Sequence, residues 1–265
     1  MPQPIAHPIS AEPPDGLTEP VEDAAEYARR YFDAVSPFYD DLTEAEGSGW
    51  NPNRVLAEVL GPLLRPGMVA LDVGAGTGQT VAVLCTVLDP GNVTAIDVSE
   101  GMLDRLRERF PAVRAEPQTV EAFAAAKPAA RFDLVTCVGT LEFVRDSPSF
   151  LRVCAKLLRP RGLLAVTYMP VVHFLEAASD RVYREPGAFA AELAEAGFAL
   201  NRDVELVAYR EAGEPVLYHM VVANRRRLRW QHHPRPQAPT FTMSEGMSSP
   251  KATVVSDTQR VPSPL

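Results

Sequence analysis

The central part of the chain alternates short apolar runs with amphipathic stretches. The apolar runs lie at 68–73, 93–97, 132–138 and 163–168. Consecutive apolar positions of this length are typical of strands buried on both faces of a parallel sheet. The amphipathic stretches, with apolar residues at helical spacing, lie at 77–88, 100–110, 148–158 and 188–196. This alternation of strand and helix predicts a doubly wound α/β fold.

Residues with capping chemistry mark the ends of several predicted helices. Ser99 is placed to cap the helix at 100–110, and Asp146 or Ser147 is placed to cap the next one. Gly197 follows the last predicted helix, where a glycine can adopt the left-handed conformation that ends it. These signals set the helix boundaries independently of the apolar pattern.

The end of the folded region changes character. Two β-type runs, 201–210 and 215–224, are joined by Glu211-Ala212-Gly213-Glu214, which is typical of a hairpin. The sequence predicts a mostly parallel, seven-stranded, Rossmann-like sheet. The hairpin forms its antiparallel, C-terminal edge.

The two ends of the chain are rich in proline and poor in aromatic residues. Such segments bury too little surface to offset their chain entropy, so we expect disordered tails at 1–23 and 231–265. Residues 24–230 are predicted to form one domain. Its aromatic-rich first part, 24–50, resembles a helical lid.

Composition narrows the function classes. The 265-residue chain is 46% hydrophobic and has a formal net charge of −8, which disfavours a surface built for nucleic-acid phosphates or an anionic membrane. Its three cysteines are far apart, and no apolar run is long enough to span a bilayer. We expect a cytoplasmic protein that acts on a small molecule, with no metal site, nucleic-acid partner or membrane partner. The sequence gives no indication of oligomeric state.

The strongest chemical signal is the stretch Leu71-Asp72-Val73-Gly74-Ala75-Gly76-Thr77-Gly78-Gln79. A strand that runs into alternating glycines makes a turn where backbone can approach a ligand closely. Asp97 ends the next strand, and a carboxylate there can accept hydrogen bonds from both hydroxyls of a ribose. These features predict a nucleoside site at the carboxyl edge of the sheet.

The spacing of the glycines indicates which nucleoside-containing cofactor the turn binds. Dinucleotide sites use G-x-G-x-x-G, whereas Gln79 stands here in place of the last glycine. Asp72 is poorly suited to a pyrophosphate and well suited to the ammonium group of an amino acid. S-adenosylmethionine carries that ammonium and no phosphate, so we expect it as the cofactor, in preference to a nicotinamide nucleotide.

These motifs resemble those of the class I S-adenosylmethionine-dependent methyltransferases of the small-molecule type, over roughly residues 50–224. The similar stretches, in order, are Arg65–Gly74, Ala95–Leu103, Phe132–Val135 with Val138–Val144, Leu157–Leu164 and Glu195–Phe198. The resemblance implies methyl transfer by in-line displacement to a small acceptor of secondary or specialised metabolism. The alternative is a protein that binds the cofactor without transferring methyl, such as a cyclase.

The resemblance also implies a set of cofactor-binding residues. These are Asp72, Gly74, Ala75, Gly76, Gly78, Asp97, Val98, Met102, Gln118, Thr119 and Val138. Gln118 is preferred as the partner of the adenine amino group because its amide oxygen can accept a hydrogen bond, with Glu116 as the alternative. Phe143 stands where many relatives carry a histidine, so no base is carried over to that position.

A base is needed only if the acceptor must lose a proton. His173, in the stretch after the 163–168 strand, is the first candidate, and Tyr39 is the second. Tyr168 and Glu142 are weaker candidates. Gly139 and Thr140 occupy the loop where a metal-binding carboxylate would be expected, which disfavours a metal-dependent mechanism.

Overall fold

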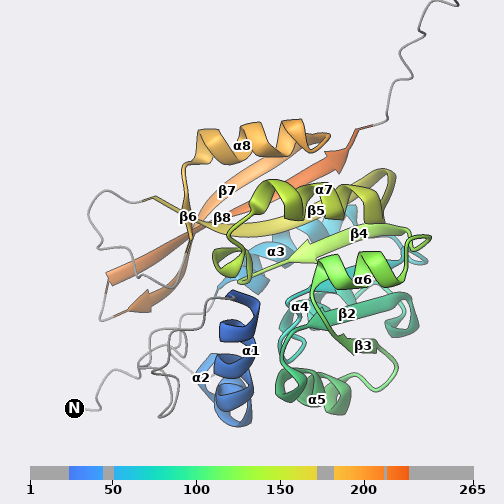
Figure 1. The fold of residues 1–265 in the computed structure, drawn as a ribbon, viewed down its shortest axis with the longest axis vertical. Helices are drawn as coiled ribbons and strands as arrows, with labels where there is room; N and C mark the ends of the chain where they lie inside the picture. The colour runs from blue at the N-terminus through green and yellow to red at the C-terminus, as the bar shows by residue number, and fades with distance from the viewer. Residues whose placement is uncertain (1–23, 44–50, 172–181, 212–213, 227–265) are drawn as a thin grey trace, which may run out of the picture. The chain divides into compact units, whose positions relative to one another are not determined.

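The computed structural model describes residues 24–43, 51–171, 182–211 and 214–226, and all structural statements refer to these. Seven strands form one continuous sheet in the order β3-β2-β1-β4-β5-β8-β7, and β6 pairs with β5 outside this path (Figure 1). The strands are β1 (Ala70–Val73), β2 (Val93–Asp97), β3 (Arg114–Pro117), β4 (Phe132–Cys137), β5 (Leu158–Pro170), β6 (Tyr183–Arg184), β7 (Phe198–Glu211) and β8 (Glu214–Arg225). β3, β2, β1, β4 and β5 pair in parallel, and β8 pairs antiparallel with both β5 and β7.

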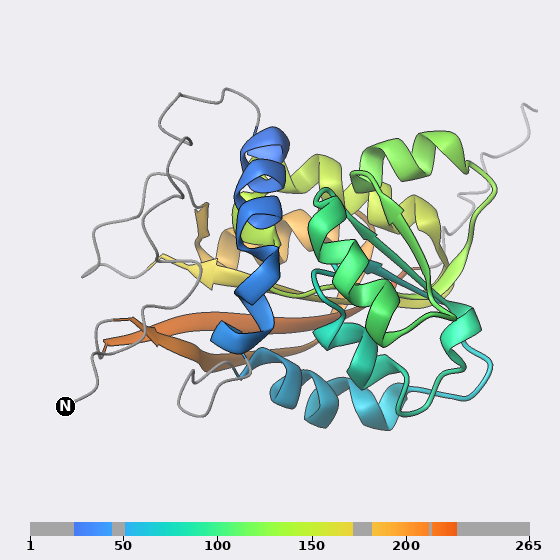
Figure 2. The same ribbon diagram turned by 90° about the horizontal axis from the view of Figure 1, so that it is seen from below.

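Helices cover both faces of this sheet, so the domain has three layers (Figures 1 and 2). The α-helices are α1 (Ala24–Val35), α2 (Tyr39–Thr43), α3 (Pro52–Leu60), α4 (Gln79–Leu84), α5 (Glu100–Arg109), α6 (Val120–Ala126), α7 (Ser147–Leu157) and α8 (Pro186–Glu195). The 3-10 helices are η1 (Ser36–Phe38), η2 (Gly61–Leu63), η3 (Pro90–Asn92) and η4 (Leu141–Phe143). The buried apolar residues of α3, α4 and α5 form one cluster, and those of α6, α7 and α8 form the other.

The α/β prediction is confirmed, including the antiparallel hairpin edge. β2 has the predicted bounds, Ser99 accepts a hydrogen bond from the Met102 amide as the cap of α5, and Asp146 caps α7 through the Ser149 amide. Gly197 ends α8 with a φ of 90°. The predicted seven strands make the continuous path, and the two-residue β6 is an eighth that its short sequence gives no pattern to predict.

Several predicted boundaries are wrong. β1 begins at Ala70 and not at 68, and β7 begins at Phe198 and not at 201. The helix expected at 77–88 begins at Gln79, because Gly78 has a φ of 93° and stands as its N-cap in the left-handed conformation. A side chain at Gly78 would also meet the Phe110 ring at 3.0 Å, so α5 packs directly on this turn. β5 begins at Leu158 and not at 163, because its first residues extend along β4 before a register shift.

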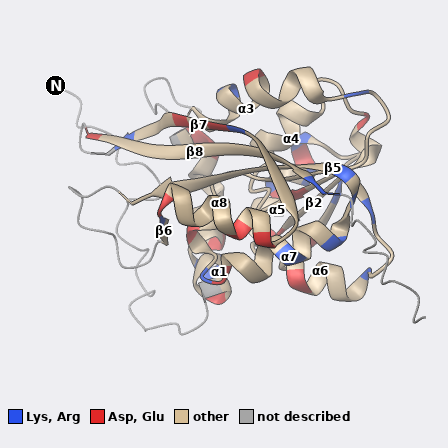
Figure 3. Ribbon diagram, turned by 90° about the horizontal axis from the view of Figure 1, so that it is seen from above, with Lys and Arg blue, Asp and Glu red and all other residues tan. Residues whose placement is uncertain are grey.

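The α1–α2 segment (residues 24–43) packs on α5, as the Tyr31, Val35 and Met102 side chains form a separate buried cluster. The predicted lid at 24–50 falls on this segment up to residue 43, and the predicted tails at 1–23 and 231–265 lie outside the described residues. None of the described helices combines the length and hydropathy needed to cross a membrane. Acidic and basic positions are interspersed over the described helices (Figure 3).

Arg161 is the one described residue other than glycine with a positive φ, at 70°, and its side chain is exposed. An L-residue is disfavoured in this conformation, so Arg161→Gly should raise the free energy of unfolding by about 0.5–1 kcal/mol. Urea unfolding measures the change. Arg161→Ala is the matched control, because it removes the same side chain and retains the strain. Equal stability of the two variants would contradict the assignment of strain.

Candidate functional site

The glycine turn between β1 and α4 is built around the end of β2. The amides of Gly74 and Ala75 both donate to the Ile96 carbonyl, at 2.8 and 3.1 Å. A side chain at Gly74 would come within 2.1 Å of the Thr140 hydroxyl, so this position requires glycine for space as well as for its φ of 66°. The turn therefore lies between the end of β2 and the loop after β4.

Asp97 holds this turn from the last position of β2. One carboxylate oxygen accepts from the Gly76 amide at 2.8 Å, and the other accepts from the Ser99 amide at 2.9 Å. Burial raises the pKa of Asp97 despite these backbone hydrogen bonds, and the negative charge of Asp33 raises it further. Each oxygen has capacity for one more hydrogen bond, which fits a carboxylate that also binds a diol.

Asp72 is fully buried on β1, directly before the turn. Its Oδ1 accepts from the Thr136 hydroxyl at 2.6 Å, while its Oδ2 has no partner among the described residues. Burial raises the pKa of Asp72 to about 7, with a smaller contribution from the charge of Asp97. An unpaired buried carboxylate is costly, so this position favours a cation nearby.

A polar cavity of about 50 Å³ lies beside the glycine turn, on the side of α3 and α4. We call it cavity 1. Its lining is Phe32, Tyr39, Asn53, Gly74, Ala75, Gly76, Thr77, Gln79, Thr80, Asp97, Met102, Val138 and Gly139. The Asn53 amide donates to the Gln79 side chain at 3.1 Å and accepts from the Thr80 hydroxyl at 3.3 Å, so neutral polar groups form much of this wall.

A larger, more apolar cavity of about 240 Å³ lies on the side of α6 and α7. We call it cavity 2. Its lining is Ala25, Ala28, Val73, Gly74, Asp97, Val98, Gln118, Thr119, Val120, Glu121, Thr140, Phe143, Val144 and Phe150. Gly74 and Asp97 belong to both linings, so the two cavities meet at the turn and the end of β2.

The α1–α2 segment contributes to both cavities and is tied to the same loops. Asp33 accepts from the Ser99 hydroxyl at 2.7 Å and from the Gly101 amide at 3.1 Å. Asp40 accepts from the Thr77 hydroxyl in the glycine turn. The segment is thus joined by hydrogen bonds to the two loops that carry Gly76 and Asp97.

Residues 71–164 match a protein family described as a methyltransferase domain. The chain is also 25% identical to the 1,6-didemethyltoxoflavin-N1-methyltransferase of Burkholderia thailandensis, solved with 1,6-didemethyltoxoflavin and S-adenosylhomocysteine. That likeness covers 79% of this chain and 93% of the other, with a TM-score of 0.59. Residues 71–164 therefore match a methyltransferase domain, and the similar structure holds S-adenosylhomocysteine, the demethylated form of the cofactor that the glycine spacing predicts.

Two curated methyltransferases are also similar. The ubiquinone biosynthesis O-methyltransferase of Xanthomonas campestris pv. campestris is 35% identical over 144 residues, which is 53% of this chain and 56% of the relative. The ubiquinone/menaquinone biosynthesis C-methyltransferase UbiE of Shewanella sediminis is 29% identical over 158 residues, covering 56% and 61%. The chain therefore spans little more than half the length of these curated relatives.

Most of the predicted cofactor residues lie around the two cavities. Gly74, Ala75, Gly76, Asp97, Met102 and Val138 line cavity 1, and Val98, Gln118 and Thr119 line cavity 2. Asp72 is buried behind the turn, and Gly78 packs against Phe110 without lining either cavity. Glu116, the alternative to Gln118, lies outside both linings, where it pairs with Lys127 and accepts from the Gln118 amide.

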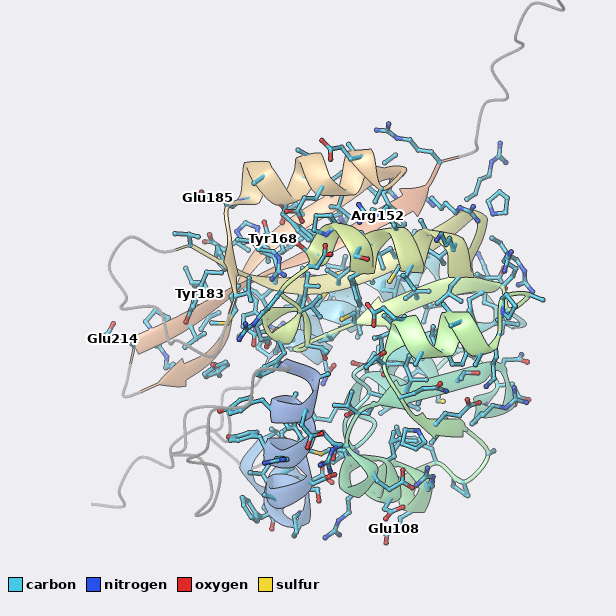
Figure 4. The ribbon with its side chains drawn as sticks, viewed as in Figure 1. Glu108, Arg152, Tyr168, Tyr183, Glu185 and Glu214 are labelled. Atoms are coloured by element: carbon cyan, nitrogen blue, oxygen red, sulfur yellow. The ribbon has the colours of Figure 1, made fainter. Side chains whose placement is uncertain are left out.

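The predicted base candidates are spread over different parts of the domain. His173 lies outside the described residues. Tyr39 lines cavity 1, and burial together with the charges of Asp97, Glu142 and Asp40 raises its pKa, so its phenol stays protonated at neutral pH. Tyr168 is buried between β5 and α8, where its ring packs on Phe189 (Figure 4). Glu142 is fully buried and accepts from the Tyr218 hydroxyl at 2.6 Å.

Several residues that line the cavities were not among the predicted cofactor or base residues. They are Ala25, Ala28, Phe32, Asn53, Thr77, Gln79, Thr80, Val120, Glu121, Gly139, Thr140, Phe143, Val144 and Phe150. Phe32 belongs to the aromatic stretch that indicated a lid, and Gln79 was noted only as a departure from the dinucleotide pattern. Asn53 carried no signal, because its place depends on how α3 packs against α4.

The raised pKa of Asp72 makes stability depend on pH. The folded-state pKa of about 7 lies above the ordinary value, so folding favours the protonated acid. The stability from this group is present below the unfolded pKa and is lost as pH rises through about 7. Without cofactor, wild-type Tm should therefore fall between pH 6 and 8. Asp72→Asn should lose most of this decline, and its Tm at pH 8 should exceed wild type by several degrees.

Thermal melts of both proteins at pH 6, 7 and 8 provide the measurement. Asp133→Asn is the control, since Asp133 also accepts from a backbone amide, that of Val69, and lies at the opposite end of the strands. A pH dependence that persists unchanged in Asp72→Asn would assign it to other groups.

Proposed function

We propose that this protein transfers a methyl group from S-adenosylmethionine to a small organic acceptor. The observation that carries the proposal is the position of Asp97, which is shared by a polar cavity and an apolar cavity beside the glycine turn. S-adenosylmethionine is a nucleoside joined to an amino acid. Its base suits a wide apolar cavity, its amino acid suits a narrow polar one, and its ribose hydroxyls need a hydrogen-bond acceptor between the two.

In this proposal the adenine occupies cavity 2. Val98 and Val120 offer apolar contacts to a flat ring, and the Gln118 amide oxygen can accept from the adenine amino group. The Gln118 amide nitrogen already donates to Glu116 at 2.8 Å, which orients the side chain and leaves its oxygen available. The ribose hydroxyls then lie at the carboxylate of Asp97.

The methionine portion is proposed to occupy cavity 1. The buried Asp72 carboxylate lies on the face of the sheet that faces α3 and α4, because Leu71 and Val73 pack on the opposite side. It can attract the ammonium group from beneath the turn. Asn53, Gln79 and Thr80 offer neutral donors for the carboxylate of the amino acid.

When bound, the cofactor supplies an activated methyl group on a sulfonium and a neutral thioether as leaving group. The protein's part is to hold the acceptor in line and to exclude water. Tyr39, whose phenol stays protonated, can donate a hydrogen bond at the acceptor side but does not serve as a base at neutral pH. His173 remains our proposed base for an acceptor that must lose a proton.

The similar proteins support a small acceptor without fixing its reacting atom. Their names describe an O-methyltransferase and a C-methyltransferase of quinone biosynthesis, and an N-methyltransferase that acts on 1,6-didemethyltoxoflavin. We propose that the acceptor is a small organic molecule, as these names indicate for the similar proteins. We also propose that it belongs to specialised metabolism.

We further propose that the α1–α2 segment acts as a lid. Ala25, Ala28, Phe32 and Tyr39 line the cavities, so cofactor exchange requires this segment to move. The bonds of Asp33 to Ser99 and Gly101 oppose that movement. Two hydrogen bonds to a charged acceptor contribute about 1.5–3 kcal/mol each when they are fully formed.

Asp33→Ala should therefore accelerate dissociation of S-adenosylhomocysteine by about tenfold or more. Surface plasmon resonance measures the rate. Glu26→Ala is the matched control on the same helix, because among the described residues Glu26 pairs with Arg29 and Arg30 at the surface and with no residue of the cavities. Equal dissociation rates for Asp33→Ala and wild type would rule out the lid.

The central test is cofactor binding and turnover. S-adenosylmethionine should bind with no comparable affinity for NAD, and Asp97→Asn should weaken binding by about tenfold to a hundredfold, since two ribose hydroxyls lose a charged acceptor. Isothermal titration calorimetry measures both, with Asp133→Asn as a folded control. Release of S-adenosylhomocysteine with a panel of phenol, amine and activated-carbon acceptors then reports transfer. Cofactor binding without release from any acceptor class would favour a non-methylating role.

A further inference from the structure

Two aromatic side chains of the α1–α2 segment line cavity 1 together with residues of the glycine turn. Phe32 and Tyr39 both belong to its lining, together with Gly74 and Val138. Their ring centroids lie 6.2 Å apart at an interplanar angle of 75°, and Phe32 also meets the Phe143 ring edge-on at 5.6 Å. These contacts hold the Phe32 and Tyr39 rings in place at one side of cavity 1, which we call the aromatic wall.

The charges around this wall are predominantly negative. Asp97 is the only charged residue in the described lining of cavity 1, and Asp72 is buried beside it. The field at the Tyr39 phenol is likewise set by carboxylates, those of Asp97, Glu142 and Asp40. Arg109 pairs with Asp40 at 3.4 Å and is not part of the lining. Aromatic faces in such a setting attract a cation.

The sulfur of the proposed cofactor falls in this cavity. It is bonded to the ribose on one side and to the amino-acid chain on the other. With the ribose at Asp97 and the ammonium near Asp72, the sulfur must lie between them, beside Gly74 and opposite the aromatic wall. It is a cation in S-adenosylmethionine and neutral in S-adenosylhomocysteine.

We propose that Phe32 and Tyr39 recognise the positive charge of the sulfonium and so make this site select the charged methyl donor over its neutral product. This inference rests on the proposed function. It adds a specificity that the cofactor motifs do not supply, because the glycine turn, Asp72 and Asp97 contact parts that donor and product share.

The experiment compares three ligands that differ at one position. They are S-adenosylmethionine, neutral S-adenosylhomocysteine, and sinefungin, which carries an ammonium group in place of the methylated sulfur centre. Isothermal titration calorimetry gives Kd for each with wild type, Phe32→Leu and Tyr39→Leu. Leucine keeps apolar bulk and removes the aromatic face. Each variant should weaken the two cationic ligands by about tenfold relative to S-adenosylhomocysteine.

Two further variants separate charge recognition from packing. Tyr39→Phe keeps the aromatic face without the hydroxyl, so it should preserve the wild-type ratio of affinities. Phe38→Leu removes the neighbouring aromatic ring, which is 45% exposed and lines neither cavity, and should change no affinity. Thermal melts confirm that each variant is folded.

The outcomes distinguish the inference from the proposed function. Failure of all three ligands to bind folded wild type would overturn the proposed function itself. Binding of all three, with Phe32→Leu and Tyr39→Leu weakening neutral and charged ligands by the same factor, would overturn only the charge recognition. A selective loss for the cationic ligands, preserved selectivity in Tyr39→Phe and no change in Phe38→Leu would establish it.

Discussion

The site depends on one buried carboxylate at the end of β2. Asp97 binds the Gly76 amide with one oxygen and the Ser99 amide with the other, and thereby joins the turn after β1 to the loop after β2. Ser99 in turn caps α5 and donates its hydroxyl to Asp33 of α1. A continuous set of hydrogen bonds thus runs from the glycine turn to the segment that covers it. Removing the charge at Asp97 would affect the ligand and the shape of the site together.

This arrangement buries two carboxylates, and no Lys or Arg among the described residues pairs with either. Burial raises the pKa of both Asp72 and Asp97; the charge of Asp97 raises that of Asp72 further, and the charge of Asp33 raises that of Asp97. The fold tolerates this because backbone amides and the Thr136 hydroxyl donate to the two side chains. A ligand with an ammonium and a sulfonium would relieve the remaining cost. The electrostatic cost of these two buried carboxylates therefore favours a nucleoside that carries positive groups beside them.

Local sequence patterns predicted most of the strands and helices, but not α3, α6 or β6. Consecutive apolar residues specify β2, and the Ser99 and Asp146 side chains specify helix starts, because both effects act within a few residues. The same patterns could not show that Gly78 packs against Phe110 and lines neither cavity, because Phe110 is distant in sequence and reaches Gly78 only when α5 packs on the turn. They also could not place Asn53 beside Gln79, or divide the site into two cavities, because these depend on contacts between distant segments.

The two proposals about the α1–α2 segment are physically linked. Phe32 and Tyr39 line cavity 1 only while this segment lies against the glycine turn, so any attraction between their rings and a cation also favours the covered state. A ligand shifts such an equilibrium by its difference in affinity for the two states. A charged methyl donor would then stabilise coverage more than its neutral product does. Transfer of the methyl group removes the positive charge, so the reaction itself would weaken the closure and favour release of the product.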